Sequence, residues 1–298
     1  MIIIKIMHSS KILKEKIIGN PGEIENDPAP GRKGAFMAHY RNELFIISGQ
    51  GEYYYNDIFR FRPNRPRYQL IATTGSTKIQ GVYYGVYETY IYTYGGYTGE
   101  DYSDKLYRFD IENFIWQTIT NTTNTIEGKA YGDAVVYSNY LITIGGTRKT
   151  EVVNDIEILD LTTYTWFPAA QGLNNAVEGL TATLYNDGIA VIFGGRNGGI
   201  TYNTVEYFEC DSGKMDVQET YGIIPEARSN HTAEQYNEYM YVFAGSGNEN
   251  YNTIHRLNCE TRVWRILSDK LSNYINFATS TKLDSYMFIY GGSDEGGN

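Results

Sequence analysis

Cysteine is scarce in this sequence, and its scarcity excludes a disulfide-built scaffold. The 298 residues include two cysteines, Cys210 and Cys259, which give no framework of paired half-cystines. They lie 49 residues apart at equivalent positions of a repeat, so we expect them to be too distant to bond to each other and to act as small apolar residues. Because proteins of reducing compartments use cysteine in this way, we expect a cytoplasmic protein, with the nucleus as the second location.

Basic charge and long apolar runs are also missing. Lys and Arg number 25 against 35 Asp and Glu, which gives a formal net charge of -10. Nucleic acid and anionic membrane surfaces need clustered cations that displace counterions from phosphates, so neither is expected as a partner. No run reaches the roughly 18 apolar residues of a membrane span, and the apolar start Met1–Met7 is too short for a signal peptide.

Residue patterns that carry catalysis or hold metals are lacking as well. The four histidines, His8, His39, His231 and His255, fall at different offsets in the repeat, and no His/Cys cluster has the spacing of metal ligands. No nucleophile motif is recognisable, and the glycine-rich run Gly194–Gly199 follows an expected strand without opening a helix, which argues against a phosphate loop. The sequence therefore predicts no catalytic residue, no metal site, no cofactor and no enzymatic activity.

An internal repeat organises the chain instead. Six apolar runs each end in a small residue followed by glycine, and the successive terminal glycines are 47, 50, 49, 50 and 47 residues apart. Such runs are apolar almost without alternation, as expected of strands covered on both faces. The runs are Leu44–Gly49, Tyr90–Gly96, Tyr140–Gly146, Ile189–Gly195, Tyr239–Gly245 and Tyr286–Gly292.

Two further markers keep the same step. Nine or ten residues after each of the first five glycines comes a polar-polar-aliphatic triplet, such as Asn56–Ile58. Each unit thus offers four short strands, which we name A to D: the apolar run is B, A precedes it, C starts at the triplet, and D carries a large residue. We expect that residue to pack between neighbouring units. In chain order it is Tyr68, Trp116, Trp166, Met215 and Trp264.

This pattern resembles the kelch repeat, whose period is about 50 residues. The resemblance covers essentially the whole chain, and it implies an all-β fold in which four-stranded antiparallel blades surround a central channel. We therefore expect residues 1–298 to form one six-bladed kelch β-propeller domain.

The last blade is expected to draw on both ends of the chain. Strands A and B of the sixth unit have no C and D strands after them, but residues 2–6 and 11–18 have the character of the missing pair. Counting from Gly292 through the end of the chain to its start places Ile3 in the aliphatic slot and Leu13 in the slot of the large residue. Such pairing removes open sheet edges. The alternative is that these residues form a flexible extension.

A partner is expected to bind where loops gather on the rigid disc. Because strands alternate in direction, the D-to-A and B-to-C loops emerge on one face, which we call the loop face. Cations there suit bidentate pairing with carboxylates, although the face also carries Glu52, Glu100, Asp101, Glu249, Asp294 and Glu295. Exposed tyrosines in a B-to-C loop are candidate anchors. The candidate binding residues are Arg32, Tyr53, Tyr54, Lys129, Arg148, Arg196, Asn197 and Arg228.

Three functions remain open. The first is a protein-interaction module or scaffold that binds a protein or peptide, with an acidic peptide as the hypothesis drawn from similarity to kelch adaptors of cullin ligases. The second is a metal-independent small-molecule enzyme, which the similarity to kelch-like sugar-acid isomerases keeps open. The third is a protein that binds actin or another part of the cytoskeleton, as some kelch proteins do. The sequence favours the first, and it gives no oligomeric state.

Overall fold

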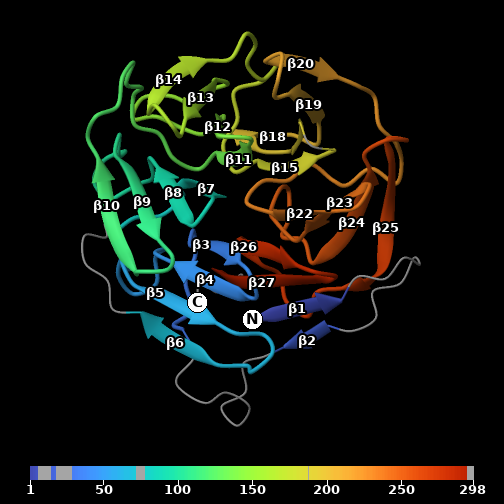
Figure 1. Ribbon diagram of the computed structural model, residues 1–298. Coiled ribbons are helices and arrows are strands. Elements are labelled where there is room, and N and C mark those ends of the chain that lie inside the picture. The colour runs from blue at the N-terminus through green and yellow to red at the C-terminus, as the bar shows by residue number, and fades with distance from the viewer. Residues whose placement is uncertain (6–14, 18–28, 72–77, 187, 294–298) are drawn as a thin grey trace.

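Six β-sheets are arranged as the blades of a propeller around a central axis (Figure 1). The computed structural model of the protein describes residues 1–5, 15–17, 29–71, 78–186 and 188–293. Strands that follow one another within a blade pair antiparallel in the order expected from the repeat. The predicted all-β kelch propeller with four-stranded antiparallel blades is therefore confirmed. No helix in the described part of the chain is long and apolar enough to cross a membrane.

The A strands form the inner wall of the ring. Each contacts the A strands of the two neighbouring blades, so the six strands enclose the axis (Figure 1). In blade order they are β3 (Phe36–Tyr40), β7 (Tyr83–Tyr87), β11 (Asp133–Tyr137), β15 (Thr181–Tyr185), β22 (Thr232–Tyr236) and β26 (Asn276–Leu283).

The B strands follow outward, and their side chains are almost wholly buried because blades cover both of their faces. The B strands are β4 (Glu43–Ile47), β8 (Tyr90–Tyr94), β12 (Tyr140–Ile144), β16 (Ile189–Phe193), β23 (Tyr239–Phe243) and β27 (Tyr286–Ser293). The first five C strands are β5 (Ile58–Phe61), β9 (Leu106–Asp110), β13 (Ile156–Asp160), β19 (Val205–Glu209) and β24 (Thr253–Asn258). The D strands that follow them are β6 (Tyr68–Ile71), β10 (Ile115–Ile119), β14 (Thr165–Pro168), β20 (Lys214–Val217) and β25 (Val263–Lys270).

The sixth sheet contains strands from both ends of the described chain, in the order β2 (Glu15–Ile17), β1 (Ile2–Lys5), β27, β26. Its register differs from the expected one. In blade 1 the triplet residue Ile58 lies opposite Ile47, two residues before the terminal glycine, whereas Ile3 lies opposite Phe288, four residues before Gly292. Ile3 is thus two positions beyond the slot predicted for it. A shift of two residues leaves each side chain on the same face of the sheet, and Ile2 and Ile4 are buried against blade 5. Leu13 lies outside the described residues.

Two short additions depart from the simple repeat. In blade 5 a fifth strand, β21 (Tyr221–Gly222), pairs in parallel with β25. It belongs to the D-to-A linker, which thereby satisfies backbone groups on the outer edge of that blade. In blade 4 the B-to-C loop forms a small hairpin of β17 (Arg196–Asn197) and β18 (Ile200–Thr201).

The large residues of the D strands pack between blades, as predicted. Trp166 of blade 3 contacts Tyr94 of blade 2 with ring centroids 4.7 Å apart. Trp264 of blade 5 contacts Phe193 of blade 4 at 5.0 Å. Both tryptophans are at most 2% exposed. The core is therefore a series of clusters between neighbouring sheets, each shared by two blades.

Backbone hydrogen bonds join the blades in two closed rings. In the inner ring, a residue at the entry of each A strand donates its N–H to the carbonyl of the equivalent residue in the preceding blade, at 2.7–3.1 Å. All six residues have positive φ, between 54° and 66°. They are Gly34, Gly81, Tyr131, Gly179, Asn230 and Phe277.

In the outer ring, the terminal glycine of each B strand donates to a carbonyl of the next blade, at 2.8–3.0 Å. The six acceptors precede the inner-ring residues along the chain. In blade order they are Arg32, Ile79, Lys129, Val177, Arg228 and Ile275. Cations occupy the odd blades and aliphatic residues the even ones, so the propeller has an approximate threefold pattern beneath its sixfold repeat.

This alternation is related to the residue that precedes each terminal glycine, which is glycine in four blades, Ser48 in blade 1 and Ala244 in blade 5. A Cβ at Gly95, Gly194 or Gly291, the doublet residues that face a cationic blade, would lie 2.2, 2.6 or 2.1 Å from the carbonyl oxygen of that cation's residue. Ser48 and Ala244 face the aliphatic residues Ile79 and Ile275, and there a Cβ is accommodated at φ 57°. Gly145 faces Val177, and a Cβ there would lie 2.7 Å from Leu180 Cδ2.

Replacing Gly95 with Ala is expected to destabilise the protein much more than replacing Ser48 with Ala. The added methyl group would meet the Lys129 carbonyl at a backbone conformation with φ of 71°, so we expect a loss of about 2 kcal/mol or more in the free energy of unfolding. Ser48→Ala keeps its Cβ and serves as the matched control. Chemical denaturation of both variants measures the difference, and equal midpoints would contradict this account of the doublets.

Candidate partner-binding face and central channel

The loop face carries a cavity at the mouth of the central channel, which we call the vestibule. In five blades the D-to-A and B-to-C loops are joined by isolated backbone bridges, such as Lys33 with Gln50 and Glu178 with Arg196. These bridges hold the loops of each blade together. The vestibule has a volume of about 310 Å³ and is lined by Lys33, Gln80, Tyr131, Glu178, Arg196, Asn230 and Phe277.

Tyrosines cover the loop face from blade 1 to blade 3. Tyr97 contacts Tyr54 at 6.4 Å, Tyr102 at 5.3 Å and Tyr131 at 6.3 Å between ring centroids. Burial raises the pKa of Tyr54, Tyr102 and Tyr131. We call these four residues the tyrosine cluster; it reaches the vestibule at Tyr131, whose hydroxyl accepts a hydrogen bond from Gln80 Nε2 at 2.7 Å.

Tyr53 was the most accessible of the predicted anchors. It is 59% exposed, and its ring lies 4.6 Å from that of Tyr55. Tyr54 is half-buried within the tyrosine cluster. The two neighbouring tyrosines therefore differ in exposure. The ring of Tyr53 is largely open to solvent, whereas the ring of Tyr54 packs against another tyrosine.

Two of the predicted arginines lie inside the protein. Arg32 and Arg228 have fully buried side chains. The guanidinium of Arg32 donates to the Ser48 carbonyl and to both oxygens of Asp57, and it lies over the Tyr55 ring at 4.2 Å. Its location gives it no solvent contact through which to reach a partner.

Arg228 repeats this arrangement in blade 5. It donates to the Ala244 carbonyl at 2.9 Å and to Glu226 Oε2 at 2.9 Å, over the ring of Tyr251 at 4.5 Å. Both arginines thus cap the carbonyl of the residue before the terminal glycine in their own blade. A side chain that binds a partner must be exposed to solvent. Arg32 and Arg228 are buried in this structure, so the binding role predicted for them does not fit their location.

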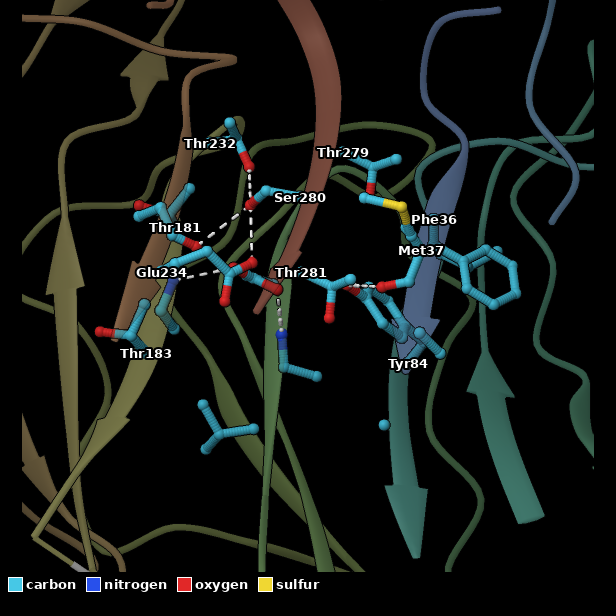
Figure 2. Close-up of a pocket in the computed structure, with 18 of the residues that line it drawn as sticks. Phe36, Met37, Tyr84, Thr181, Thr183, Thr232, Glu234, Thr279, Ser280 and Thr281 are labelled. Atoms are coloured by element: carbon cyan, nitrogen blue, oxygen red, sulfur yellow. Dashed lines mark hydrogen bonds between the residues drawn. The ribbon is translucent and has the colours of Figure 1, made fainter. Parts of the chain in front are cut away.

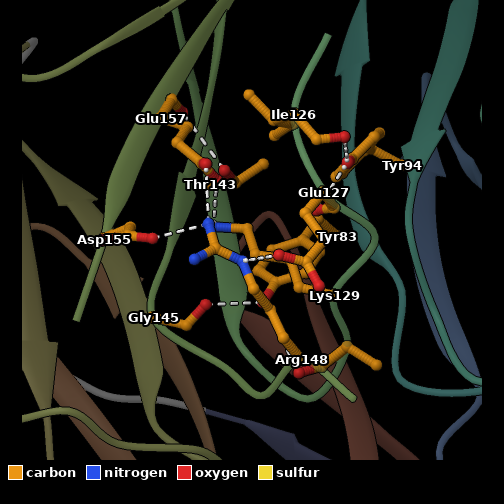
Figure 3. A network of polar contacts seen from close by, with 11 residues as sticks. Tyr83, Tyr94, Ile126, Glu127, Lys129, Thr143, Gly145, Arg148, Asp155 and Glu157 are labelled. Atoms are coloured by element: carbon orange, nitrogen blue, oxygen red, sulfur yellow. Dashed lines mark hydrogen bonds and ion pairs between the residues drawn. The ribbon is translucent and has the colours of Figure 1, made fainter. Parts of the chain in front are cut away.

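Lys129 occupies the same slot in blade 3 and anchors an ionic network (Figure 3). Its fully buried Nζ lies 2.6 Å from Glu157 Oε2 and 4.9 Å from the centroid of Tyr83. Burial lowers the pKa of Lys129, and Glu157 opposes that shift. The Tyr83 hydroxyl donates to the Gly145 carbonyl at 2.6 Å, in place of the guanidinium found in blades 1 and 5.

Arg148 completes this network at the edge of the loop face. Its NH2 lies 2.6 Å from Asp155 and 3.1 Å from Glu157, and its Nε lies 3.8 Å from Glu127 (Figure 3). Burial works to lower the pKa of Arg148, but Asp155 and Glu157 raise it overall. With 16% of its side chain exposed, Arg148 is committed to three carboxylates of the protein itself.

Arg196 and Asn197 are the predicted residues that the hairpin of blade 4 presents. Arg196 lines the vestibule with 43% of its side chain exposed and pairs with Glu178 at 3.1 Å. Asn197 is exposed, and Ile200 on the facing strand is 61% exposed. Lys33, which was not among the residues predicted from the sequence, also lines the vestibule and has no ion-pair partner among the described residues.

Below the inner ring, the central channel opens into a cavity of about 660 Å³ lined by all six A strands (Figure 2). Two carboxyl groups face it. Burial raises the pKa of Asp133 to about 6, and its oxygens accept hydrogen bonds from the backbone N–H groups of Ala134 and Ala182, both at 2.8 Å. Burial raises the pKa of Glu234 to about 7, and the Ser280 hydroxyl donates to it at 2.7 Å.

Both cysteines and two of the histidines in the described part of the chain are buried. Cys210 and Cys259 are free and buried, and burial raises the pKa of each thiol to about 11. Burial lowers the pKa of His231 to about 3 and that of His255 to about 4. Among the described residues, no group of three or more His, Cys, Asp and Glu side chains is arranged to hold a metal ion.

Replacing the buried Arg228 with Met is expected to cost about 2–4 kcal/mol of unfolding free energy, since it leaves the Ala244 carbonyl without its donor. Arg196→Met removes a half-exposed ion pair and should cost less than about 1 kcal/mol. Urea denaturation of the two variants tests this contrast. Similar losses would show that burial does not separate the two arginines.

Replacing Glu234 with Gln is expected to stabilise the protein more at pH 8 than at pH 5. The folded-state pKa of Glu234, about 7, lies above the ordinary value of 4.5, so its contribution to stability is present at low pH and is lost as pH rises through 7. Gln does not titrate. The variant should therefore gain about 3 °C or more in melting temperature relative to the wild type between pH 5 and pH 8, and a constant difference would contradict the raised pKa.

Comparisons with known proteins place the fold in context. The Attractin/LZTR1 β-propeller family matches residues 91–296. The chain is 22% identical over 284 residues to the leucine-zipper-like transcriptional regulator 1 homolog of Drosophila melanogaster, covering 85% of this chain and 28% of that protein. It is 26% identical over 213 residues to human Kelch domain-containing protein 3, covering 68% and 45%.

A third similarity is to a much larger protein. The chain is 23% identical over 266 residues to the flagellar outer-arm dynein alpha chain of Chlamydomonas reinhardtii, covering 79% of this chain and 6% of that protein. The chain therefore spans less than half the length of each of these three relatives.

Proposed function

Because the chain belongs to the Attractin/LZTR1 β-propeller family, we propose that it is a protein-interaction module that binds a partner protein or peptide through its loop face. Two relatives are a transcriptional regulator homolog and a kelch-domain protein by name, and kelch propellers of this kind suggest an interaction role. The observation that carries the proposal is the loop face around the vestibule, where the exposed Tyr53 and the tyrosine cluster lie beside the cations Lys33 and Arg196.

The physical case rests on rigidity and on aromatic area. Tyrosines supply a large contact surface with few rotatable bonds, and residues of this type dominate binding at protein interfaces. Here Tyr97 is held by three neighbouring rings, so little side-chain entropy remains to be lost when a partner binds. A partner residue that enters the vestibule would contact its lining, which includes Tyr131, Phe277 and Lys33.

The sequence assigned the acidic-peptide preference to several cations of the loop face, but fewer cations are available there to bind an acidic ligand. Arg148 and Arg196 are already paired with carboxylates of the protein, so a partner would have to compete for them. Lys33 is the vestibule cation without a partner among the described residues, and we propose that one acidic side chain of the ligand pairs with it. We also propose a cytoplasmic or nuclear location, which the two free cysteines support.

A variant of the loop face should lose its partner while remaining folded. We would compare the wild type with a triple variant, Lys33→Ala, Tyr53→Ala and Arg196→Ala, by affinity capture from native lysate followed by mass spectrometry. Lys33 and Arg196 line the vestibule and Tyr53 is exposed, so we expect an unchanged melting temperature and a loss of at least tenfold in captured partner.

The matched control replaces exposed arginines on the opposite face, Arg41→Ala and Arg62→Ala, which lie at the A-to-B and C-to-D turns of blade 1. This control should capture the partner as the wild type does. Loss of the partner in the control alone would move the binding site to the opposite face. Equal capture by all three proteins would reject the loop face.

A further inference from the structure

The channel cavity beneath the inner ring has two chemically different walls (Figure 2). Strands β15, β22 and β26 contribute six buried hydroxyl side chains to it. Strands β3, β7 and β11 contribute no Ser or Thr, and present residues such as Tyr84, Val86 and Val136. The hydroxyl wall consists of Thr181, Thr183, Thr232, Thr279, Ser280 and Thr281.

Two groups on this side of the cavity, Thr183 and Glu234, keep unused hydrogen-bonding capacity. Thr183 donates to the Gln235 side chain at 3.1 Å, which leaves its oxygen free to accept. Ser280 donates to one oxygen of Glu234, and the other oxygen of Glu234 has no hydrogen bond among the described residues. A hydroxyl group both donates and accepts, so this wall suits ligand groups that do the same.

The charges in the cavity do not favour a charged ligand. Asp133 is held by two backbone N–H groups. Lys282, His39 and Arg41 lie toward the end of the channel away from the vestibule, and the Lys282 Nζ lies 5.9 Å from the Tyr236 ring. Cations and carboxylates therefore occur in comparable number along the cavity, and a neutral ligand avoids the cost of desolvating an unpaired charge.

We propose that the channel is a binding site for a small neutral polyol of monosaccharide size, whose hydroxyl groups pair with Glu234, Ser280 and Thr183 and whose C–H face lies on the wall formed by Tyr84 and Val86. The cavity volume of about 660 Å³ lies within the roughly 300–1,000 Å³ range of pockets that hold small molecules. An apolar surface facing a few convergent polar groups is the usual form of such pockets. This site is distinct from the loop face.

The test uses isothermal titration calorimetry and ligand-observed NMR on the full chain. The neutral probes are myo-inositol and D-glucose, and the charged analogues are D-glucosamine and D-glucuronate. We expect at least one neutral probe to bind saturably with one site per chain, and more tightly than either charged analogue. Glu234→Gln and Thr183→Val should each weaken that binding about tenfold, the loss expected when a ligand hydroxyl loses one charged or buried partner.

Arg196→Ala in the vestibule is the matched control, and it should leave polyol binding unchanged while contributing to the loss of the protein partner. Melting temperatures establish that each channel variant is folded. The proposal is overturned if no neutral probe binds saturably, if the channel variants bind as the wild type does, or if a charged analogue binds more tightly. Because the partner test changes only loop-face residues, failure of one proposal leaves the other intact.

Discussion

The inner ring of backbone hydrogen bonds is the constraint on which the rest of this propeller depends. Each blade donates one N–H to the blade before it, and the sixth donation closes the circle from Gly34 to Phe277. The donors sit at φ between 54° and 66°, a conformation that favours glycine, yet three of the six are Tyr131, Asn230 and Phe277. A ring with six members fixes how close the A strands come, and so fixes both the channel and its mouth.

The outer ring contains the residues that precede the inner ring along the chain, and their side chains differ from blade to blade. Its acceptors alternate between cations and aliphatic residues, and the cations turn back into their own blades, where carbonyls and carboxylates neutralise them. The backbone carbonyl oxygens of the same three residues approach the doublet of the preceding blade so closely that a Cβ there would clash, and glycine occupies the position. Charge on this propeller is therefore used first to hold its sheets, and the three cations of the outer ring are not available to a ligand.

The repeat predicted the fold well because it is a property of the backbone. Spacing of the terminal glycines, the apolar B strands and the large D-strand residues each followed from packing that any blade must satisfy. The predicted register of Ile3 was wrong by two residues. A two-residue shift leaves the same side chains on each face of the sheet, so the pattern of apolar residues could not distinguish the two registers. The binding residues were harder to predict from the sequence than the fold. Arg32, Lys129 and Arg228 share one slot, 17 residues before their glycines, and an aligned cation in a repeat signals a structural role as readily as a binding one.

Accessibility separates these two roles, and it depends on contacts between residues far apart in sequence. Tyr97 and Tyr131 belong to different repeats, and only the closed ring brings them into one cluster at the vestibule. The hydroxyl wall arises in the same way, since Thr183, Glu234 and Ser280 come from three blades. A sixfold backbone with unequal side chains can thus carry different surfaces around one axis: tyrosines toward blades 1 to 3 at the loop face, and hydroxyl groups toward blades 4 to 6 within the channel.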